Sequence, residues 1–267
     1  MEKIHTNRKI TEYVKKRYGA IAKQGAVGGC CDGGCSCSPN PKDLGQLTSM
    51  LGYQEKDLAE GTTGANLGLG CGNPLAFATL QDGETVLDLG SGGGFDCFIA
   101  RRQVGEQGRV IGVDMTAEMI DLARANASRL GYTNVEFIEG AIEALPVNDE
   151  TADVIISNCV INLSLDKQSV FKEAFRVLKP GGRFSVSDVV ATAELPEMIR
   201  QDLRLHAGCV AGAEHIAVLQ ELLHNAGFIE IKLTPKDTSR EILSSWMPGT
   251  DIDQYVASYS IEAKKPR

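Results

Sequence analysis

The sequence predicts an α/β protein whose core is a mostly parallel sheet with helices on both faces. Two patterns lead to that prediction. Apolar segments of strand length alternate with segments of helical periodicity over most of the chain, and a glycine-rich turn follows the first of these strands. The chain has 267 residues, 43% of them hydrophobic and 23% charged, so it is long enough to bury a substantial core.

Few regular elements are expected before the sheet. Residues 10–22 carry apolar side chains at helical spacing and predict an amphipathic helix that lies on a larger body. Residues 25–40 are mostly Gly, Cys, Ser and Asp, which predicts a flexible loop. A short helix near 54–60 then leads into glycine-rich turns over 61–74.

The alternation that defines the sheet begins at Thr85. Strands are predicted at 85–89, 109–114, 135–138, 152–157 and 184–190. Helices are predicted at 95–103, 117–130 and 168–178, the last of which stops at Lys179-Pro-Gly-Gly182. A segment over 191–215 interrupts the alternation, and beyond it we expect a helix at 217–226, a strand at 229–233 and a last strand within 254–263.

Charge and hydropathy exclude several classes of protein. The formal net charge of −8 argues against a protein that binds nucleic acid or an anionic membrane, since such proteins carry basic patches. No segment approaches the roughly 20 apolar residues that cross a bilayer, and residues 1–8 lack the apolar core of a secretory signal. We therefore expect a cytoplasmic protein. We also expect it to be a monomer.

The glycine-rich turn is the strongest single signal for a ligand. The segment Asp88-Leu-Gly90-Ser91-Gly92-Gly-Gly94 lies between a predicted strand and a predicted helix, where an open parallel sheet binds its ligand. Glycines there permit positive φ and let a ligand approach the backbone. A nicotinamide-cofactor fingerprint would need a glycine where Phe95 stands. The pattern D-x-G-x-G-x-G instead resembles motif I of the class I S-adenosylmethionine methyltransferases, although a Rossmann-like nicotinamide site stays as the alternative.

Further segments in the order of that family strengthen the resemblance. Asp114 ends the second strand, where a carboxylate can accept hydrogen bonds from ribose hydroxyls, and Met115 follows it to pack on an adenine. The resemblance implies a Rossmann-like class I methyltransferase with a mostly parallel seven-stranded sheet, and S-adenosylmethionine as methyl donor. The candidate cofactor-binding residues are Asp88, Gly90, Ser91, Gly92, Asp114, Met115, Ile142, Glu143 and Asn158.

Eight cysteines need an explanation other than structural disulfides, which are rare in reducing compartments. Cys71, Cys159 and Cys209 are far apart in the chain, yet each stands beside a segment expected at the edge of the sheet that binds the ligand. A lone buried cysteine is usually a small hydrophobic side chain, as we expect for Cys97. Three that converge are instead suited to a soft metal or metalloid centre, because thiolates select such atoms.

The segments around these cysteines resemble those of the arsenite methyltransferases. The matching segments are Gly68-Leu-Gly-Cys71-Gly-Asn-Pro74, Ser157-Asn-Cys159-Val160 and Cys209-Val-Ala-Gly-Ala213. The resemblance implies that Cys71, Cys159 and Cys209 bind arsenic, the substrate, and are the catalytic thiols. It divides the chain into an amino-terminal helix, Cys-rich loop and lid (1–72), a cofactor-binding core (73–190), and a substrate-binding insertion with the rest of the sheet (191–267).

The chemistry of trivalent arsenic agrees with a site of three thiols. Arsenic held by three sulfurs keeps a lone pair that can attack a sulfonium methyl, so the protein needs to position the reactants but needs no general base. Methyl transfer takes arsenic formally to the pentavalent state, and neighbouring thiols can return it by forming a disulfide. Thioredoxin or glutathione would then restore the thiols. Cys30 or Cys31, in the Cys-rich loop, could deliver arsenic or supply the disulfide partner.

Two other functions stay open from the sequence. One is a methyltransferase that acts on a quinone or another small organic molecule, and the other is a metalloid-binding protein without catalytic activity. The expected substrate is arsenite or its thiol conjugates, converted to mono-, di- and possibly trimethylated products. Asp153 and Asp188 lie at strand boundaries and receive no role.

Overall fold

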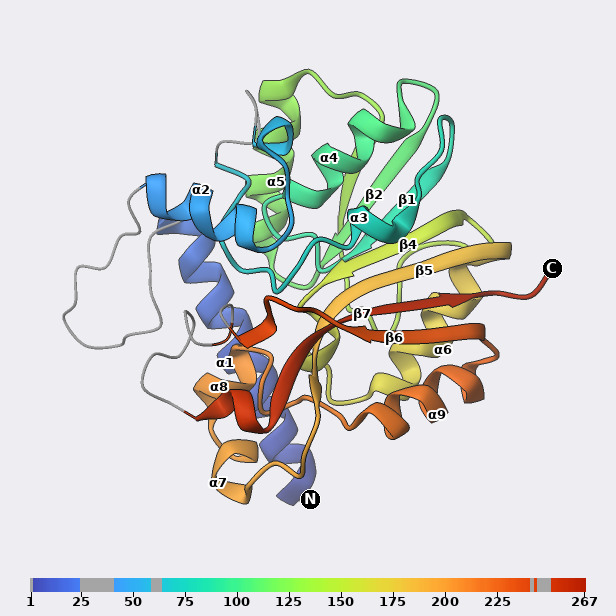
Figure 1. Ribbon diagram of the computed structural model, residues 1–267. Helices are drawn as coiled ribbons and strands as arrows, with labels where there is room; N and C mark the ends of the chain where they lie inside the picture. The colour runs from blue at the N-terminus through green and yellow to red at the C-terminus, as the bar shows by residue number, and fades with distance from the viewer. Residues whose placement is uncertain (1, 25–40, 59–63, 241–242, 244–250) are drawn as a thin grey trace.

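The computed structural model describes residues 2–24, 41–58, 64–240, 243 and 251–267 (Figure 1). Cys30 and Cys31, which we predict to take part in arsenic handling, lie outside these residues. Within the described residues, seven strands form one sheet in the order β3-β2-β1-β4-β5-β7-β6. The strands are β1 (Thr85–Leu89), β2 (Arg109–Asp114), β3 (Val135–Glu139), β4 (Ala152–Asn158), β5 (Leu178–Ala191), β6 (Ile229–Pro235) and β7 (Val256–Lys264).

The direction of the strands confirms the predicted mostly parallel sheet. Strands β1 to β5 run parallel to one another, whereas β7 is antiparallel to both β5 and β6. The chain builds outward from β1 to β3 and then returns to the other side of β1 with β4. The order of strands therefore reverses between β1 and β4, which is where open parallel sheets bind ligands at their carboxyl ends.

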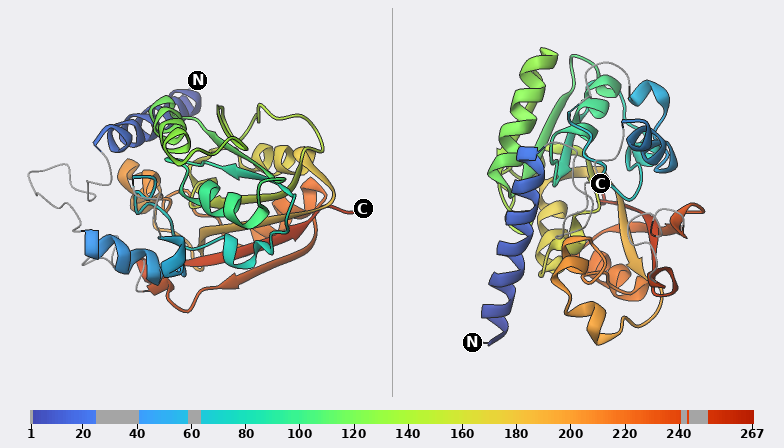
Figure 2. Two further views of the ribbon diagram at one scale, coloured as in Figure 1. Left: turned by 90° about the horizontal axis from the view of Figure 1, so that it is seen from above. Right: turned by 90° about the vertical axis from the view of Figure 1, so that its left-hand side faces the viewer.

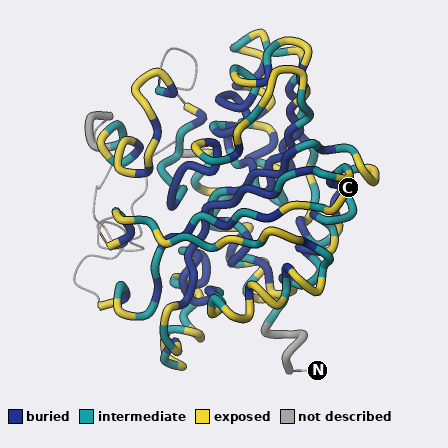
Figure 3. Tube along the Cα trace, turned by 45° about the vertical axis from the view of Figure 1, so that its right-hand side comes forward, coloured by how far each residue is buried: buried dark blue, intermediate teal, exposed yellow. Residues whose placement is uncertain are grey.

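Helices cover both faces of the sheet, because alternate residues of each strand point to opposite sides. On β1, Val86 packs with one apolar cluster and Leu87 with another, and both are fully buried. Figure 3 shows the central strands as deeply buried, whereas the edge strand β6 is mostly exposed. The first cluster lies under α3 (Leu75–Ala78), α4 (Phe95–Val104) and α5 (Ala117–Leu130), and the second under α6 (Lys167–Val177) and α9 (Ile216–Ala226).

The amino-terminal helix α1 (Glu2–Gln24) is longer than the predicted 10–22 and lies alongside α5 (Figure 2). Val14 anchors it with 1% of its surface exposed, and Lys23 pairs with Glu118 of α5 at 2.8 Å. Helix α2 (Pro41–Met50) was not predicted; it begins with a proline, as helices often do, but Gly45 weakens its helical signal.

Two predicted boundaries need correction. Of the helix expected near 54–60, the described residues 54–58 form a single 3₁₀ turn, η1 (Glu55–Asp57). Strand β5 starts at Leu178 rather than at 184, directly after α6. Pro180 disfavours helical backbone at Lys179, so the chain is already extended there, and the register shifts before Arg183 joins the regular ladder.

The predicted interruption after the fifth strand is confirmed as a compact excursion from the sheet. It holds α7 (Glu197–Arg200) and α8 (Leu203–Ala207). Its ends meet, since Ala191 bridges to His215 and donates its N–H to the carbonyl of Glu214 over 2.9 Å. The 3₁₀ turns η2 (Ile161–Leu163) and η3 (Ile252–Gln254) follow β4 and precede β7. Among the described residues, no helix combines the length and apolar character that a membrane span requires.

Candidate active site

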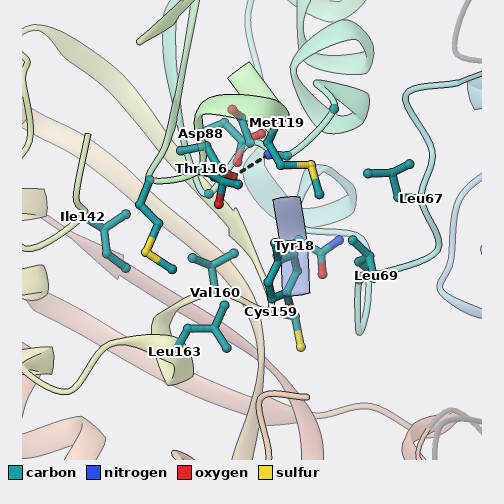
Figure 4. Close-up of a pocket in the computed structure, with 18 of the residues that line it drawn as sticks. Tyr18, Leu67, Leu69, Asp88, Thr116, Met119, Ile142, Cys159, Val160 and Leu163 are labelled. Carbon is teal, nitrogen blue, oxygen red and sulfur yellow. Dashed lines mark hydrogen bonds between the residues drawn. The ribbon is translucent and has the colours of Figure 1, made fainter. Parts of the chain in front are cut away.

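A cavity of about 670 Å³ opens at the carboxyl ends of β1, β2 and β4. Figure 4 shows side chains from distant segments, among them Tyr18 of α1, Asp88 and Cys159, around this space. The structure brings together at its wall the nine residues predicted to bind the cofactor, namely Asp88, Gly90, Ser91, Gly92, Asp114, Met115, Ile142, Glu143 and Asn158.

The glycine turn after β1 forms the floor of the cavity. Gly90 has φ of +73° and lies so close to Val160 that a Cβ there would be 2.4 Å from Val160 Cγ2. The turn is fixed to β2 because the N–H groups of Gly90 and Ser91 both donate to the carbonyl of Val113, over 2.7 and 3.0 Å. Glycine is therefore needed at position 90 for both its conformation and its lack of a side chain.

Asp114 connects that turn to the next helix. Its Oδ2 accepts from the N–H of Gly92 over 3.0 Å, and its Oδ1 accepts from the N–H of Thr116 over 2.9 Å. Burial raises the pKa of Asp114, and these two backbone hydrogen bonds oppose the rise. Each carboxylate oxygen keeps a second lone pair, so the side chain is oriented and can still accept hydrogen bonds from a ligand in the cavity.

The cavity wall is rich in carboxylates and holds an unpaired hydroxyl. Asp88 accepts from the thiol of Cys97 over 3.2 Å, and burial, followed by the charge of Asp96, raises its pKa well above the usual range. Ser91 Oγ is buried and has no hydrogen-bond partner among the described residues. A cationic ligand with hydroxyl groups fits these donors and acceptors, as the sulfonium, ammonium and ribose of S-adenosylmethionine would.

The prediction from sequence missed Asp96 and Tyr53, which lie at the same wall. Tyr53 donates its hydroxyl to Asp96 Oδ1 over 2.6 Å. Burial raises the pKa of Asp96 to about 6, while the hydrogen bonds from Tyr53 and Asn158 lower it. Asp96 lies two residues after Gly94, the last glycine of the turn, and that position could have indicated it. Tyr53 comes from the amino-terminal segment, where no sequence pattern marks it.

Two of the three predicted thiols meet beside a carboxylate. The Sγ atoms of Cys71 and Cys159 and a carboxylate oxygen of Asp188 all lie within 4.8 Å of one another. Cys209 belongs to the same buried apolar cluster, and its thiol donates to the carbonyl oxygen of Cys159 over 2.6 Å. Cys159 also lines the large cavity, so the thiol site and the cavity share a wall.

The protonation of these thiols follows from their burial. Burial raises the pKa of Cys159 well above that of a free thiol, and its hydrogen bonds with the side chains of Cys209 and Cys71 add to the rise. The hydrogen bond with Cys159 lowers the pKa of Cys209, but burial and the charge of Asp188 outweigh it, so that pKa is raised as well. Both groups are therefore thiols, not thiolates, at neutral pH.

Local backbone conformations place two of the cysteines. Cys159 and Cys209 have φ of +61° and +62°, values that residues with a side chain seldom adopt and that cluster at functional sites. The N–H of Cys159 donates to the carbonyl of Ser187 over 2.8 Å, which turns the chain at the end of β4. Asn162 Nδ2 donates to Asp188 Oδ1 over 3.0 Å and to the carbonyl of Cys209 over 3.1 Å, so one amide holds the insertion against β5.

Cys71 is held from the other side by β7 and by a lysine. Ser258 Oγ donates to the carbonyl of Cys71 over 2.7 Å. Lys236 lies against the next residue, because a Cβ on Gly72 would be 1.5 Å from its Nζ, and it donates to Ser187 Oγ over 2.5 Å. Burial lowers the pKa of Lys236. No sequence pattern marks this lysine, which follows β6.

The fold and the site define a class of protein. Residues 80–227 match the model of the "Methyltransferase domain" family. The chain belongs to this family and has the Rossmann-like fold of the class I S-adenosylmethionine methyltransferases.

Within that family the sequence is similar to arsenite methyltransferases. It is 49% identical over 264 residues to the arsenite methyltransferase of Halobacterium salinarum, which covers 96% of this chain and 66% of that protein. It is 36% identical to the human arsenite methyltransferase, over 84% of this chain and 59% of the human protein. The chain thus spans about two thirds or less of the length of these relatives.

The chain is also similar to the solved structure of an enzyme that methylates arsenic. An arsenic(III) S-adenosylmethionine methyltransferase from Chlamydomonas reinhardtii superimposes with a TM-score of 0.59 and 33% sequence identity. The match covers 83% of this chain and 73% of that one.

Proposed function

We propose that this protein methylates trivalent arsenic with S-adenosylmethionine as methyl donor. The observation that carries the proposal is the position of Cys159, which lies both in the thiol cluster and at the wall of the cofactor-sized cavity. A thiol-bound atom would therefore lie next to a methyl donor held in the cavity. The similarity to arsenite methyltransferases over 96% of this chain supports the same substrate.

The cofactor would be held by the residues at the carboxyl edge of the sheet. Asp114, fixed by two backbone N–H groups, would receive the ribose, and the unpaired Ser91 hydroxyl and the glycine turn would face the nucleoside. Asp88 and Asp96 would receive the positively charged end. When bound, S-adenosylmethionine supplies an electrophilic methyl group to the arsenic lone pair.

The thiols would bind arsenic by exchanging with its hydroxyl groups. Arsenite is As(OH)₃ at neutral pH, and each thiol that bonds to arsenic releases one hydroxyl, which leaves as water with the thiol's proton. The raised pKa of Cys159 and Cys209 suits this exchange, because a protonated thiol brings the proton that the leaving hydroxyl needs. The buried site excludes water that would compete for arsenic.

The methylated arsenic would then need two electrons to return to the trivalent state. Two neighbouring thiols supply them by forming a disulfide, which thioredoxin or glutathione reduces. Cys30 and Cys31 are proposed as additional thiols for delivery or reduction. A cytoplasmic location would keep all of these thiols reduced.

The experiment is arsenic speciation by chromatography with elemental mass detection, after incubation with arsenite, S-adenosylmethionine and a thiol reductant. We expect methylated arsenic from the wild type and none from Cys159→Ser, while the cofactor still raises the melting temperature of that variant. Methylation by Cys159→Ser at the wild-type rate contradicts the three-thiol site. Unmethylated arsenite with cofactor bound contradicts the proposed substrate.

A further inference from the structure

The buried thiol site contains one donor group more than a trivalent arsenic atom needs, since such an atom bonds to three sulfurs and keeps its lone pair. The Sγ atoms of Cys71 and Cys159 and a carboxylate oxygen of Asp188 all lie within 4.8 Å of one another. Cys209 adds a third sulfur, because its side chain is hydrogen-bonded to that of Cys159 and donates to the Cys159 carbonyl over 2.6 Å. Three sulfurs and one carboxylate thus form a buried Cys–Asp cluster.

This set of donors is typical of a tetrahedral zinc site. Zinc binds thiolates at about 2.3 Å and carboxylate oxygens at about 2.0–2.2 Å, so its tetrahedral ligands lie roughly 3.6–3.8 Å apart. Atoms that already lie within 4.8 Å of one another reach that spacing through small side-chain movements. Magnesium and calcium take oxygen ligands, and Cu(I) prefers sulfur alone. The Cys–Asp cluster therefore selects zinc among the common metal ions.

Asp188 is oriented by hydrogen bonds in the way that metal-binding carboxylates usually are. Its Oδ1 accepts from Asn162 Nδ2 over 3.0 Å and from the N–H of Val189 over 2.8 Å. Its Oδ2 accepts from the N–H of Ile161 over 3.0 Å. These donors fix the carboxylate, and because a carboxylate accepts about four hydrogen bonds, a lone pair remains for a metal ion.

Two lysines lie beside the Cys–Asp cluster, and their charge offsets part of the negative charge that three thiolates and a carboxylate bring. Lys236 Nζ lies against the residue after the first cysteine, since a Cβ on Gly72 would be 1.5 Å away. Burial lowers the pKa of Lys167, and the charge of Glu214, followed by that of Asp188, raises it. The two ammonium groups donate to neutral acceptors, a serine hydroxyl and a backbone carbonyl.

We propose that the Cys–Asp cluster also binds zinc, and that zinc and arsenite compete for it. The zinc ligands are Cys71, Cys159, Cys209 and Asp188. The competition rests on the proposed function, whereas the zinc site does not. Arsenic uses the three sulfurs alone, so Asp188 is the ligand that zinc needs and arsenic does not.

Both steps balance without a change of oxidation state. When zinc binds, the three thiols release their protons to solvent and the ion stays divalent. When arsenite displaces it, As(OH)₃ and three protons from solvent give As(S)₃, Zn²⁺ and three water molecules. The displacement therefore needs no reactant other than arsenite and water.

The first test is zinc binding by the reduced, arsenic-free protein in which the cysteines at 30, 31, 35 and 37 are serine, so that their thiols do not bind the metal. X-ray absorption should show one zinc per chain with three sulfur neighbours and one oxygen neighbour. Asp188→Asn should weaken zinc binding at least about tenfold against a chelating dye, because even a change to a group that orients a ligand costs about 10–100-fold. Its affinity for arsenite should change less than about twofold. Absence of zinc, or equal zinc affinity in Asp188→Asn, overturns the proposal.

Two variants are matched controls for that test. Asp153 also accepts a backbone N–H but lies near the other end of β4, so Asp153→Asn should bind zinc as the parent protein does. Cys97 is a buried thiol that donates to Asp88 over 3.2 Å, so Cys97→Ser should keep all three sulfur neighbours of zinc. A loss of zinc in either control as large as in Asp188→Asn contradicts the assigned ligands.

The second test leaves all four ligands in place. Arsenite added to the zinc-loaded protein should release one zinc ion for each arsenic bound, as followed with the same dye. Arsenic that binds while zinc stays bound overturns the competition. A protein that binds zinc but no arsenite contradicts the proposed function and supports the zinc site, whereas one that methylates arsenite and binds no zinc contradicts the zinc site alone.

Discussion

The backbone N–H of Cys71 donates a hydrogen bond to Oδ1 of Asn158 over 3.0 Å. The amide nitrogen of the same side chain donates to the carbonyl of Gly72 over 2.7 Å and to the hydroxyl of Tyr53 over 2.9 Å. One asparagine at the end of β4 therefore connects the loop that carries Cys71, a proposed arsenic ligand, to the wall of the proposed cofactor cavity.

Asn158→Ala should weaken both halves of the site. The change removes hydrogen bonds to buried groups on two segments, and each unsatisfied group costs about 1–3 kcal/mol. We expect the dissociation constant for S-adenosylmethionine, measured by calorimetry, to rise about tenfold and the rate of arsenite methylation to fall at least as much. Asn134→Ala is the control, because Asn134 also ties loops together, through the carbonyls of Gly105 and Gly108, but does not line the cavity. Equal effects of the two variants on cofactor affinity would argue against a role of Asn158 in connecting the Cys71 loop to the cavity.

Cofactor affinity should depend on pH through Asp96. Its pKa is raised to about 6 in the folded protein, so it is neutral below that pH and ionised above it. A cationic cofactor prefers the ionised form, and its affinity should therefore rise as the pH increases through about 6. Tyr53→Phe removes a hydrogen bond that lowers this pKa, and should move the midpoint to higher pH. Binding curves between pH 5 and 8 would show the midpoint moving in the opposite direction if the assignment were wrong.

The same raised pKa predicts a trend in stability without cofactor. Ionising Asp96 costs the folded protein more than the unfolded chain, whose aspartates titrate near pH 3.9. The contribution of this group to the free energy of unfolding should be complete below about pH 3.9 and be lost as the pH rises through about 6. Comparing wild type with Asp96→Asn in urea between pH 4.5 and 7.5 measures it. The stability of the variant relative to wild type should increase with pH.

Two glycines with similar backbones separate conformational strain from steric fit. Gly83 has φ of +81° and no atom within 4 Å of an added Cβ, whereas Gly90 has φ of +73° and Val160 at 2.4 Å. Gly83→Ala should cost about 1–2 kcal/mol of stability, as left-handed backbone does, and leave cofactor affinity unchanged. Gly90→Ala should cost more and weaken cofactor binding, with partial rescue by Val160→Ala. A Gly90→Ala protein with wild-type affinity would contradict this account of the turn.

Local patterns were sufficient to bring the residues predicted to bind the cofactor to one cavity. A glycine turn after a strand and an acid at the end of the next one are contiguous signals, and parallel strands bring their carboxyl ends to one edge, so Gly90 and Asp114 could be placed from sequence. Tyr53 could not, because its position depends on how the amino-terminal segment packs against the sheet. Nothing in the sequence next to Tyr53 reports that packing.

The thiol side was predicted less completely for a related reason. The strand order places Cys159 at the end of β4. The approach of Cys71 depends instead on how the loop before α3 packs against Asn158 and Ser258, and the direction of the Cys209 thiol depends on the fold of the insertion after β5. Asp188 was seen at a strand boundary and given no role. Its position beside the thiols becomes visible only in the pairing of Asn158 with Ser187, which places Asp188 one residue beyond the end of β4, near Cys159.

The most direct test of the proposed function is a single-turnover methyl transfer. The purified protein is loaded with one equivalent of arsenite, mixed with S-adenosylmethionine carrying an isotope-labelled methyl group, and analysed for label on arsenic before any external reductant is added. The account predicts about one labelled methyl group per arsenic in the wild type and none in Cys159→Ser. Cofactor bound at full occupancy with no label on arsenic would contradict it.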